Sequence, residues 1–236
     1  MAIYKRVLLK LSGEQLSGQH DSGIDAELMG WIASEVKKVT AVGVQVAVMV
    51  GGGNFVRGAQ LAGHGIRRVT ADHIGMLGTM MNGLAITDVF EDCGLPTRCL
   101  SNIFAEQVSE PFVHRLANKH FDNGRTIILA GGLGRPYLTT DTAAVSLGLE
   151  LDCDVVLKAT KVDGVYNKDP AKHENAVRFE VVSFDQAVAD PNIKVMDKAA
   201  MGLAMEQNMQ IVIFNLMQED NLLKLVQGEK IGTKIS

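Results

Sequence analysis

Three consecutive glycines, Gly51 to Gly53, end an apolar segment, and the cationic side chain of Arg57 follows them. Glycine lets backbone N–H groups approach a ligand closely, and a guanidinium group matches the geometry of phosphate oxygens. A glycine turn at the carboxyl end of a strand, followed by a cation, is a common way of holding phosphates. The pattern favours a phosphate-binding turn, although a tight strand-to-helix turn also recruits glycine.

The same arrangement recurs along the chain. The apolar segment Val7 to Leu11 contains Lys10 and runs into Gly13, the segment Thr126 to Ala130 runs into further glycines, and Lys158 follows a third apolar segment. The carboxyl ends of parallel strands share one edge of a sheet, where ligands bind. We therefore expect these loops to converge on one site.

The candidate catalytic side chains are Lys10, Arg57, Asp141 and Asp197. Lys10 could contact transferring phosphates or simply face solvent at the end of its strand. Asp141 and Asp197 each begin a predicted helix, where a carboxylate is also an ordinary cap. Together these residue types suit phosphoryl transfer, in which charge on the moving group must be neutralised.

Motifs of other enzyme classes are missing from the sequence. It contains no GxxxxGK[ST], no GxGxxG after a strand, no HExxH and no GxSxG. These absences exclude the P-loop and argue against a dinucleotide fold, a zinc protease and a nucleophile elbow. The histidines are scattered without metal-ligand spacing, so no protein-bound metal is predicted.

Apolar periodicity predicts alternating strands and helices over the whole chain. This alternation favours an open, mostly parallel α/β sheet covered by helices on both faces, in one domain spanning residues 1–236. Predicted strands are Val7–Leu11, Val44–Val50, Thr97–Leu100, Thr126–Ala130, Val155–Lys158 and Gln210–Phe214. Predicted helices are Ala26–Val42, Thr70–Phe90, Phe112–Asn123, Asp141–Leu149, Phe184–Ala189, Asp197–Asn208 and Asn221–Gln227.

The predicted helix Thr70–Phe90 carries Ile74, Leu77, Met81 and Leu84 on one side. It also contains Gly75, Gly78 and Gly83, each of which costs roughly 1 kcal/mol of helix stability relative to alanine. These glycines suggest close approach of another helix or subunit. A weak or kinked helix is the alternative.

Composition limits the protein's surroundings and partners. The 236 residues carry 23 basic and 27 acidic side chains, and this net charge of −4 argues against general nucleic-acid binding. No apolar run reaches the ~18 residues that a membrane span requires. Three cysteines without paired spacing argue against a disulfide framework and favour a reducing cytoplasm.

Several segments together resemble the amino acid kinase superfamily and, within it, the branch of bacterial UMP kinases. The resemblance runs from about Tyr4 to Thr233. It rests on the segments KLSGE (residues 10–14), GGGNFVRG (51–58), ADHIGM (71–76), GRPYLTTDTAA (134–144), LKATKVDGVYNKDP (157–170) and KVMDKAA (194–200).

The resemblance implies an ATP site, a UMP site and an assembly. ATP contacts would be Lys10, Leu11, Ser12, Gly13, Gly53, Arg57, Thr160, Tyr166 and Asp169. UMP contacts would be Gly52, Asp72, Leu133, Gly134, Arg135, Pro136, Tyr137, Leu138, Thr139 and Thr140, with Asp72 holding ribose hydroxyls. It further implies Mg²⁺ carried by the ATP phosphates, a homohexamer and inhibition by UTP.

Two other readings compete with transfer of a phosphoryl group from ATP to UMP. One is a superfamily enzyme that phosphorylates a carboxylate, a carbamate or a small phosphate. The other is a non-catalytic protein that binds nucleotide or stores an oxyanion on the same fold. The ADHIGM and LGRPYLTT segments speak against the first, and the set Lys10, Arg57, Asp141 and Asp197 speaks against the second.

Overall fold

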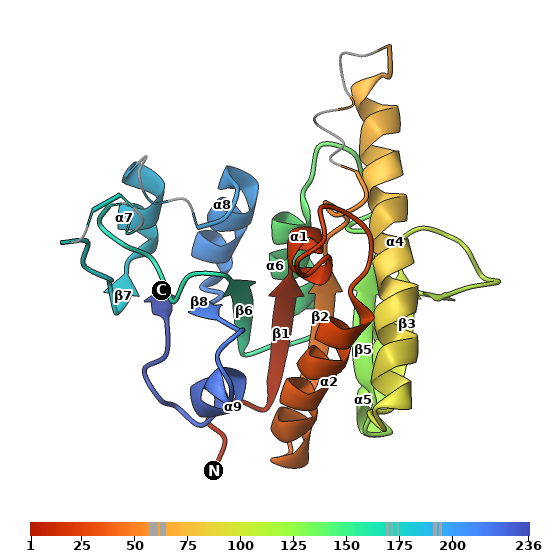
Figure 1. Cartoon of the computed structure of the whole chain (residues 1–236), viewed down its shortest axis with the longest axis horizontal. Coiled ribbons are helices and arrows are strands. Elements are labelled where there is room, and N and C mark those ends of the chain that lie inside the picture. Colours follow the sequence, from red (N-terminus) through yellow and green to blue (C-terminus); the bar gives the residue numbers. More distant parts are fainter. Residues whose placement is uncertain are drawn as a thin grey trace.

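A nine-stranded sheet runs through the part of the chain that the computed structural model describes, which is residues 1–56, 61, 65–168, 170, 172–173, 175–190, 193 and 195–236. The strand order is β4-β3-β5-β2-β1-β6-β8-β9-β7, and only the pair β8–β9 is antiparallel (Figure 1). The strands are β1 (Arg6–Leu11), β2 (Gln45–Val50), β3 (Thr97–Ser101), β4 (Glu110–Pro111), β5 (Thr126–Ala130), β6 (Val155–Thr160), β7 (Val181–Val182), β8 (Ile211–Asn215) and β9 (Thr233–Ile235).

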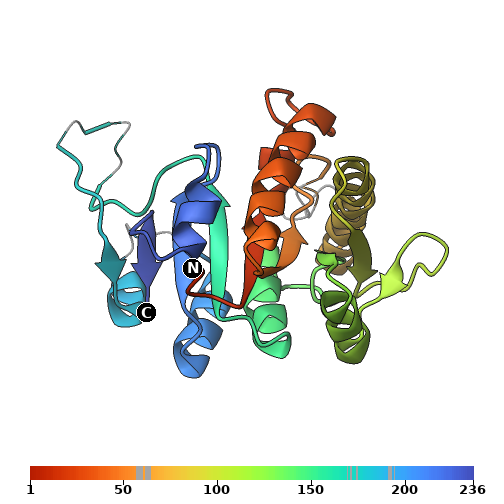
Figure 2. The same ribbon diagram turned by 90° about the horizontal axis from the view of Figure 1, so that it is seen from below.

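Helices cover both faces of this sheet. Helices α1, α2, α4 and α9 contribute to one hydrophobic core, and α5 to α8 contribute to a second core on the opposite face. In Figure 2, α2 lies on one side of the sheet while α6 and α8 lie on the other. The helices are α1 (Gly13–Leu16), α2 (Ala26–Ala41), α4 (Arg68–Asp92), α5 (His114–Asp122), α6 (Thr140–Glu150), α7 (Phe184–Ala189), α8 (Lys198–Gln207) and α9 (Asn221–Val226).

Burial on both faces explains why the central strands are apolar at consecutive positions. In β1, Val7 and Leu9 enter the first core while Leu8 enters the second. In β2, Val48 and Met49 divide between the cores in the same way. Near-continuous apolar strands are typical of parallel sheets covered on both sides. The predicted fold class is therefore confirmed.

The predicted elements all occur, with ends that differ by at most two residues. Asp25 caps α2 as expected, since its carboxylate accepts a hydrogen bond from the N–H of Leu28. Among the elements formed by described residues, four short ones were missed: α1, β4, β7 and β9. Each has two to four residues, which is too short for a period of apolar residues to be recognised.

Two of the glycines of the long helix α4 approach the sheet and the glycine turn of the same chain, not another of its helices. A Cβ on Gly78 would lie 3.2 Å from the carbonyl oxygen of Gly52, and one on Gly83 would lie 3.0 Å from the Sγ of Cys99. Both neighbours belong to the same chain, so these glycines let α4 pack against its own sheet and its own glycine turn. Leu77 and Met81, which belong to the predicted apolar side of this helix, are instead 51% and 49% exposed in the single chain.

The thiols agree with the absence of a disulfide framework. Cys93, Cys99 and Cys153 are all free. Burial raises the pKa of both Cys99 and Cys153 to about 12, so these two thiols stay protonated near neutrality.

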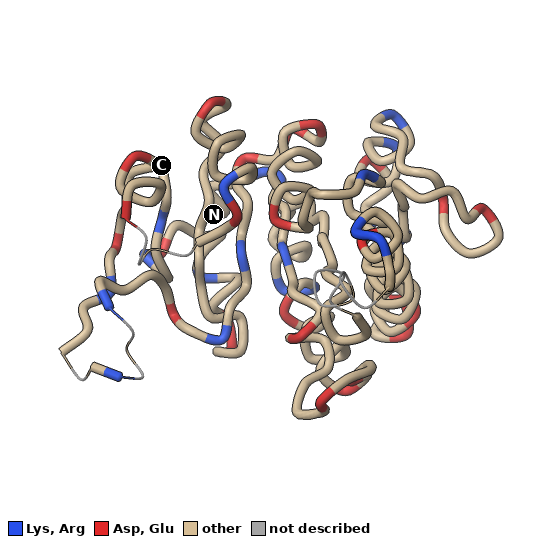
Figure 3. The backbone as a smooth tube through the Cα atoms, turned by 90° about the horizontal axis from the view of Figure 1, so that it is seen from above, with Lys and Arg blue, Asp and Glu red and all other residues tan. Residues whose placement is uncertain are grey.

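Basic and acidic positions are interspersed over the described elements (Figure 3). Attraction of an anionic ligand must therefore come from a few placed cations and backbone N–H groups. In the described part of the chain, no helix combines the length and the apolar character needed to cross a membrane.

Candidate functional site

The loops singled out in the sequence lie together at one edge of the sheet. Strands β5, β2, β1 and β6 are consecutive neighbours and all parallel, so their carboxyl ends point the same way. The glycine turns Gly51–Gly53 and Gly131–Gly134 follow β2 and β5, and the turn at Ser12 follows β1. The predicted convergence of these loops is confirmed.

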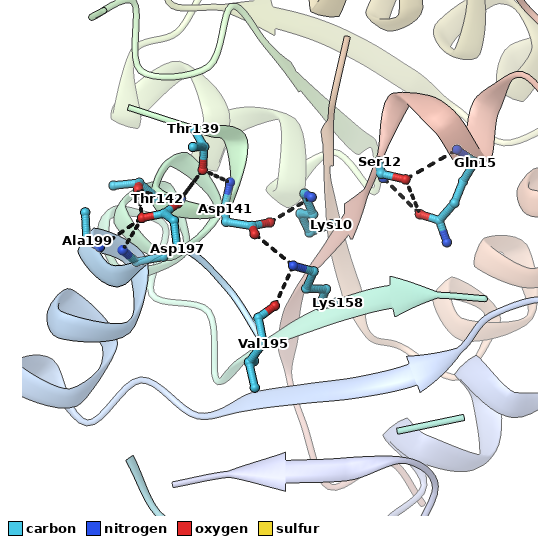
Figure 4. A network of polar contacts seen from close by, with 11 residues as sticks. Lys10, Ser12, Gln15, Thr139, Asp141, Thr142, Lys158, Val195, Asp197 and Ala199 are labelled. Carbon is cyan, nitrogen blue, oxygen red and sulfur yellow. Dashed lines mark hydrogen bonds and ion pairs between the residues drawn. The ribbon is translucent and has the colours of Figure 1, made fainter. Parts of the chain in front are cut away.

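Lys10, Asp141 and Lys158 form an ion network at this edge (Figure 4). The Nζ of Lys10 lies 2.7 Å from Oδ1 of Asp141, and the Nζ of Lys158 lies 2.8 Å from Oδ2 of the same carboxylate. The Lys158 ammonium also donates to the carbonyl oxygen of Val195 at 2.6 Å. The three side chains are 8%, 14% and 17% exposed, so the network is mostly shielded from water.

The charges in this network shift one another's protonation. Burial by itself would raise the pKa of Asp141, but the two ammonium groups outweigh it and hold that pKa below its ordinary value. Burial lowers the pKa of Lys158, and attraction to Asp141 offsets this only in part. Perturbed groups of this kind, placed at a ligand-binding edge, are typical of functional sites.

Asp197 has a different role from Asp141. It caps α8, where its Oδ1 accepts from the N–H groups of Ala199 and Ala200 at 2.9 and 3.0 Å. It also accepts hydrogen bonds from the hydroxyls of Thr139 and Thr142. Thr139 is in turn the N-cap of α6, so Asp197 fixes the start of the helix that presents Asp141.

The glycine turn after β2 is packed without room for side chains. A Cβ on Gly13 would lie 2.4 Å from the N of Gly53, and one on Gly52 would lie 2.6 Å from the carbonyl oxygen of Gly75. Both contacts are with backbone, which cannot move aside as a flexible side chain can. Glycine is therefore required at Gly13, the first residue of α1, for close approach to the turn and at Gly52 for close approach of the turn to α4.

A pair of buried amides ties this turn to α4. Asn54 donates to Oδ1 of Asn82 at 2.9 Å, and Asn82 donates back to Oδ1 of Asn54 at 2.7 Å. Asn82 also donates to the carbonyl oxygen of Gly51 at 2.7 Å. Thr79, on the same helix, accepts from the N–H of Gly131 at 2.7 Å. Helix α4 thus holds both glycine turns in place.

A cavity of about 210 Å³ lies between residues of α4, the glycine turns and the start of α6. Of the positions predicted for the acceptor nucleotide, Gly52, Asp72, Leu133, Leu138, Thr139 and Thr140 line it. Gly134, Arg135, Pro136 and Tyr137 do not line it, although the N–H of Tyr137 donates to Asp72.

A second cavity has a volume of about 900 Å³. It is lined by Lys158 and Val195 of the network and by Thr160 and Tyr166, two of the positions predicted for ATP. The hydroxyl of Thr160 donates to the carbonyl oxygens of Val162 and Phe214, whereas that of Tyr166 donates to Asp163.

The remaining predicted ATP positions divide between the network and the turns. Lys10 is in the network, Leu11 ends β1, Ser12 caps α1, and Gly13 packs on Gly53. Arg57 and Asp169 lie outside the described residues.

Asn82 and Arg68 are site residues that the sequence analysis did not select, and Lys158 was noted there only as a cation after an apolar segment, without a role. Lys158 stands beside Lys10 in the register of β1 and β6, a relationship that appears only once the strand order is known. Asn82 is a buried polar residue in a helix, and its role depends on a turn distant in sequence. Arg68 lines the smaller cavity and pairs with Asp72.

Comparisons with known proteins agree with this geometry. The model of the amino acid kinase family matches residues 5–215. A UMP kinase structure from Bacillus anthracis has 36% identity and a TM-score of 0.94, with 99% of this chain and 96% of that chain covered. A UMP kinase from Ureaplasma parvum has 29% identity, 98% coverage of both chains and a TM-score of 0.91.

A more distant structure has the same architecture. A uridylate kinase from Archaeoglobus fulgidus has 25% identity over 100% of both chains, with a TM-score of 0.75. The family match spans most of the chain, and the similar structures cover nearly all of it. This protein belongs to the amino acid kinase family and is a phosphotransferase.

Proposed function

We propose that the protein transfers the γ-phosphoryl group of ATP to UMP, giving UDP and ADP. The observation that carries this proposal is the position of the ion network. Lys158 lines the larger cavity, and Thr140, the residue before Asp141, lines the smaller one. A donor nucleotide in the larger cavity and an acceptor in the smaller would bring their phosphates to Lys10 between them. The similar structures named as UMP kinases support the choice of acceptor.

In the proposed reaction, a phosphate oxygen of UMP attacks the γ-phosphorus of ATP. A bond forms between that oxygen and the phosphorus, and the bond to the bridging oxygen of ADP breaks. The phosphate group of a nucleoside monophosphate is mostly in its doubly ionised form near neutrality, because its second pKa is about 6. The attacking group therefore needs no general base.

The protein's contribution is positioning and charge. Lys10 stabilises the negative charge on the transferring group, since a fixed ammonium in a water-poor site acts strongly on developing charge. Asp141 orients Lys10 and Lys158 through one carboxylate. Arg57 would add a further cation, and the N–H groups of Gly52 and Gly53 would bind phosphate oxygens, since that of Gly51 already donates to the carbonyl oxygen of Leu11.

A divalent metal is typical of kinases, and we propose Mg²⁺ carried by the ATP phosphates. The described residues contain no group of three or more His, Cys, Asp or Glu side chains able to hold a metal ion. Phosphate oxygens are the ligands on which Mg²⁺ depends in such sites. When bound, the metal would neutralise part of the triphosphate charge.

The assembly and its regulation extend the proposal. The exposed apolar side chains Val69, Leu77 and Met81 on α4 support burial of this surface in an oligomer, and we propose a homohexamer. We also propose inhibition by UTP, a single kinase domain over residues 1–236 and a cytoplasmic location. The homohexamer and the inhibition by UTP follow from the family resemblance, whereas the single domain rests on the pattern of elements and the location on the unpaired cysteines.

An assay of ADP release tests the reaction. The purified protein, with ATP and Mg²⁺, is given UMP, CMP, AMP, a small carboxylic acid and carbamate in turn. Rapid ADP release with UMP alone supports the proposal. Preference for an acid identifies another kinase of the superfamily, and no release with any acceptor favours the non-catalytic reading.

A further inference from the structure

Arg68 and Tyr137 hold the carboxylate of Asp72 from two sides. The Nε of Arg68 lies 2.8 Å from Oδ1 and 2.9 Å from Oδ2 of Asp72. The N–H of Tyr137, which is distant in sequence, donates to Oδ2 at 2.8 Å. The Asp72 side chain is 12% exposed and lines the smaller cavity. Its orientation is therefore set by two groups before any ligand enters.

Helix stability does not explain the position of Arg68. It is the first residue of α4, where the helix dipole disfavours a cation. The order of the pair, with the cation four residues before the anion, is also the less favourable one for a helix. Because the pair works against local helix energetics, its role is to be sought in the cavity that both residues line.

The loop that contains Tyr137 has an unfavourable backbone conformation. Tyr137 has φ of 67°, in the left-handed region that side chains rarely adopt. Its ring lies 5.4 Å from the guanidinium carbon of Arg68, a distance suited to a cation–π contact. Non-glycine residues in this region are maintained by surrounding contacts and cluster at ligand-binding sites. Arg68 thus contacts both Asp72 and Tyr137, the residue whose backbone N–H holds Asp72.

The held carboxylate retains capacity for a ligand. Two carboxylate oxygens offer about four acceptor positions, and Arg68 and Tyr137 take part of them. The remainder can accept the adjacent hydroxyls of a ribose, whereas a 2′-deoxyribose offers one hydroxyl fewer. A site that hydrogen-bonds a hydroxyl discriminates strongly against the analogue lacking it.

We propose that Arg68 is a positioning residue that acts through Asp72 to set the preference for ribose over 2′-deoxyribose in the acceptor nucleotide. This proposal rests on the function proposed above, because it takes a nucleoside monophosphate as the ligand of the smaller cavity.

The test is equilibrium binding of UMP and dUMP, measured by calorimetry on the full-length protein. The variants are Arg68→Gln, Arg68→Lys and the control Arg67→Gln, which removes the same charge from the exposed residue one position earlier. We expect Arg68→Gln to reduce the ratio of the dUMP Kd to the UMP Kd by about tenfold, chiefly through weaker UMP binding. Arg68→Lys should reduce the same ratio, since an ammonium cannot reproduce the Nε contact. Arg67→Gln should leave it unchanged.

Equal weakening of both nucleotides in the Arg68 variants would overturn the proposal, because a purely structural role moves both Kd values together. A reduced ratio in Arg67→Gln would also overturn it, since charge alone would then be responsible. Should Arg68→Gln fail to fold, Arg68→Lys decides the matter alone. Turnover of UMP by the unaltered protein is recorded separately. Its absence would count against the kinase proposal, while the Kd ratios still decide the role of Arg68.

Discussion

Lys10 and Lys158 stand side by side in the register of two parallel strands, and one carboxylate holds both. β1 and β6 pair these two residues directly, and Asp141 reaches them from the start of α6. Two ammonium groups this close would repel each other in a poorly solvated site. The shared carboxylate offsets that repulsion and keeps positive charge beside the larger cavity, which Lys158 lines.

Replacing Asp141 with asparagine should destabilise the protein. The change leaves two buried ammonium groups without their counter-charge, and breaking a buried pair in this way costs about 3–5 kcal/mol. We expect urea unfolding at neutral pH to show that the free energy of unfolding falls by an amount within that range. The control Glu219→Gln alters a carboxylate that is 78% exposed and should change stability by less than about 0.5 kcal/mol. Equal losses in the two variants would contradict the account.

The stabilisation from Asp141 should disappear in acid. Its pKa is lower in the folded protein than its ordinary value, so it contributes stability above the ordinary value and loses it as pH falls through the folded value. The difference in unfolding free energy between the unaltered protein and Asp141→Asn should therefore be present in full above the ordinary aspartate pKa of 3.8 and shrink as the pH falls below it. Urea unfolding at several pH values measures it, and a difference that grows in acid would refute the assignment.

Replacing Lys158 with methionine should slow turnover more than it weakens binding of UMP. The change removes one of the two cations held by Asp141 and the bond to Val195, while Lys10 remains. Loss of one electrostatic contact to the transition state typically costs about 10²–10³ in kcat. Steady-state kinetics with Lys161→Met as the exposed control measures the effect. A change confined to KM would show that Lys158 serves binding only.

Replacing Gly52 with alanine should disturb the contact between the glycine turn and α4. The new methyl group would lie 2.6 Å from the carbonyl oxygen of Gly75 and 2.8 Å from the N of Thr79. Overpacking of this kind typically costs about 1–3 kcal/mol. Gly202→Ala is the matched control, since nothing lies within 4 Å of its added Cβ, and it should stabilise α8 by about 0.5–1 kcal/mol. Thermal and urea unfolding should show a lower free energy of unfolding for Gly52→Ala and a higher one for Gly202→Ala than for the unaltered protein. Equal stability of the two variants would contradict the packing argument.

The fold could be predicted from the sequence because buried parallel strands are apolar at every position and helices show their own period. The core strands and most helices were placed within one or two residues, and Asp25 was recognised as a cap. The short β4, β7 and β9 form mainly through pairing with neighbouring strands, which leaves too little local pattern to recognise.

The site was predicted less completely, since its parts depend on tertiary contacts. The glycine turns and Lys10 could be recognised from residue type and from their position after apolar segments. The partner of Lys10 could not be chosen between Asp141 and Asp197, because both begin helices. The role of Lys158 beside Lys10 can be recognised only once the strand register is known. The role of Asn82 depends on its contact with a turn that is distant in sequence.

The most direct test of the account is UDP formation by Lys10→Met, compared with Lys5→Met. Lys5 precedes the same strand but lies exposed at its opposite end, so its loss removes an equal charge away from the site. Product analysis with ATP, Mg²⁺ and UMP should show normal UDP formation by Lys5→Met and the unaltered protein. For Lys10→Met we predict a fall of at least about 10²-fold with circular dichroism unchanged. Near-normal UDP formation by Lys10→Met would contradict the assignment of this edge of the sheet as the phosphoryl-transfer site.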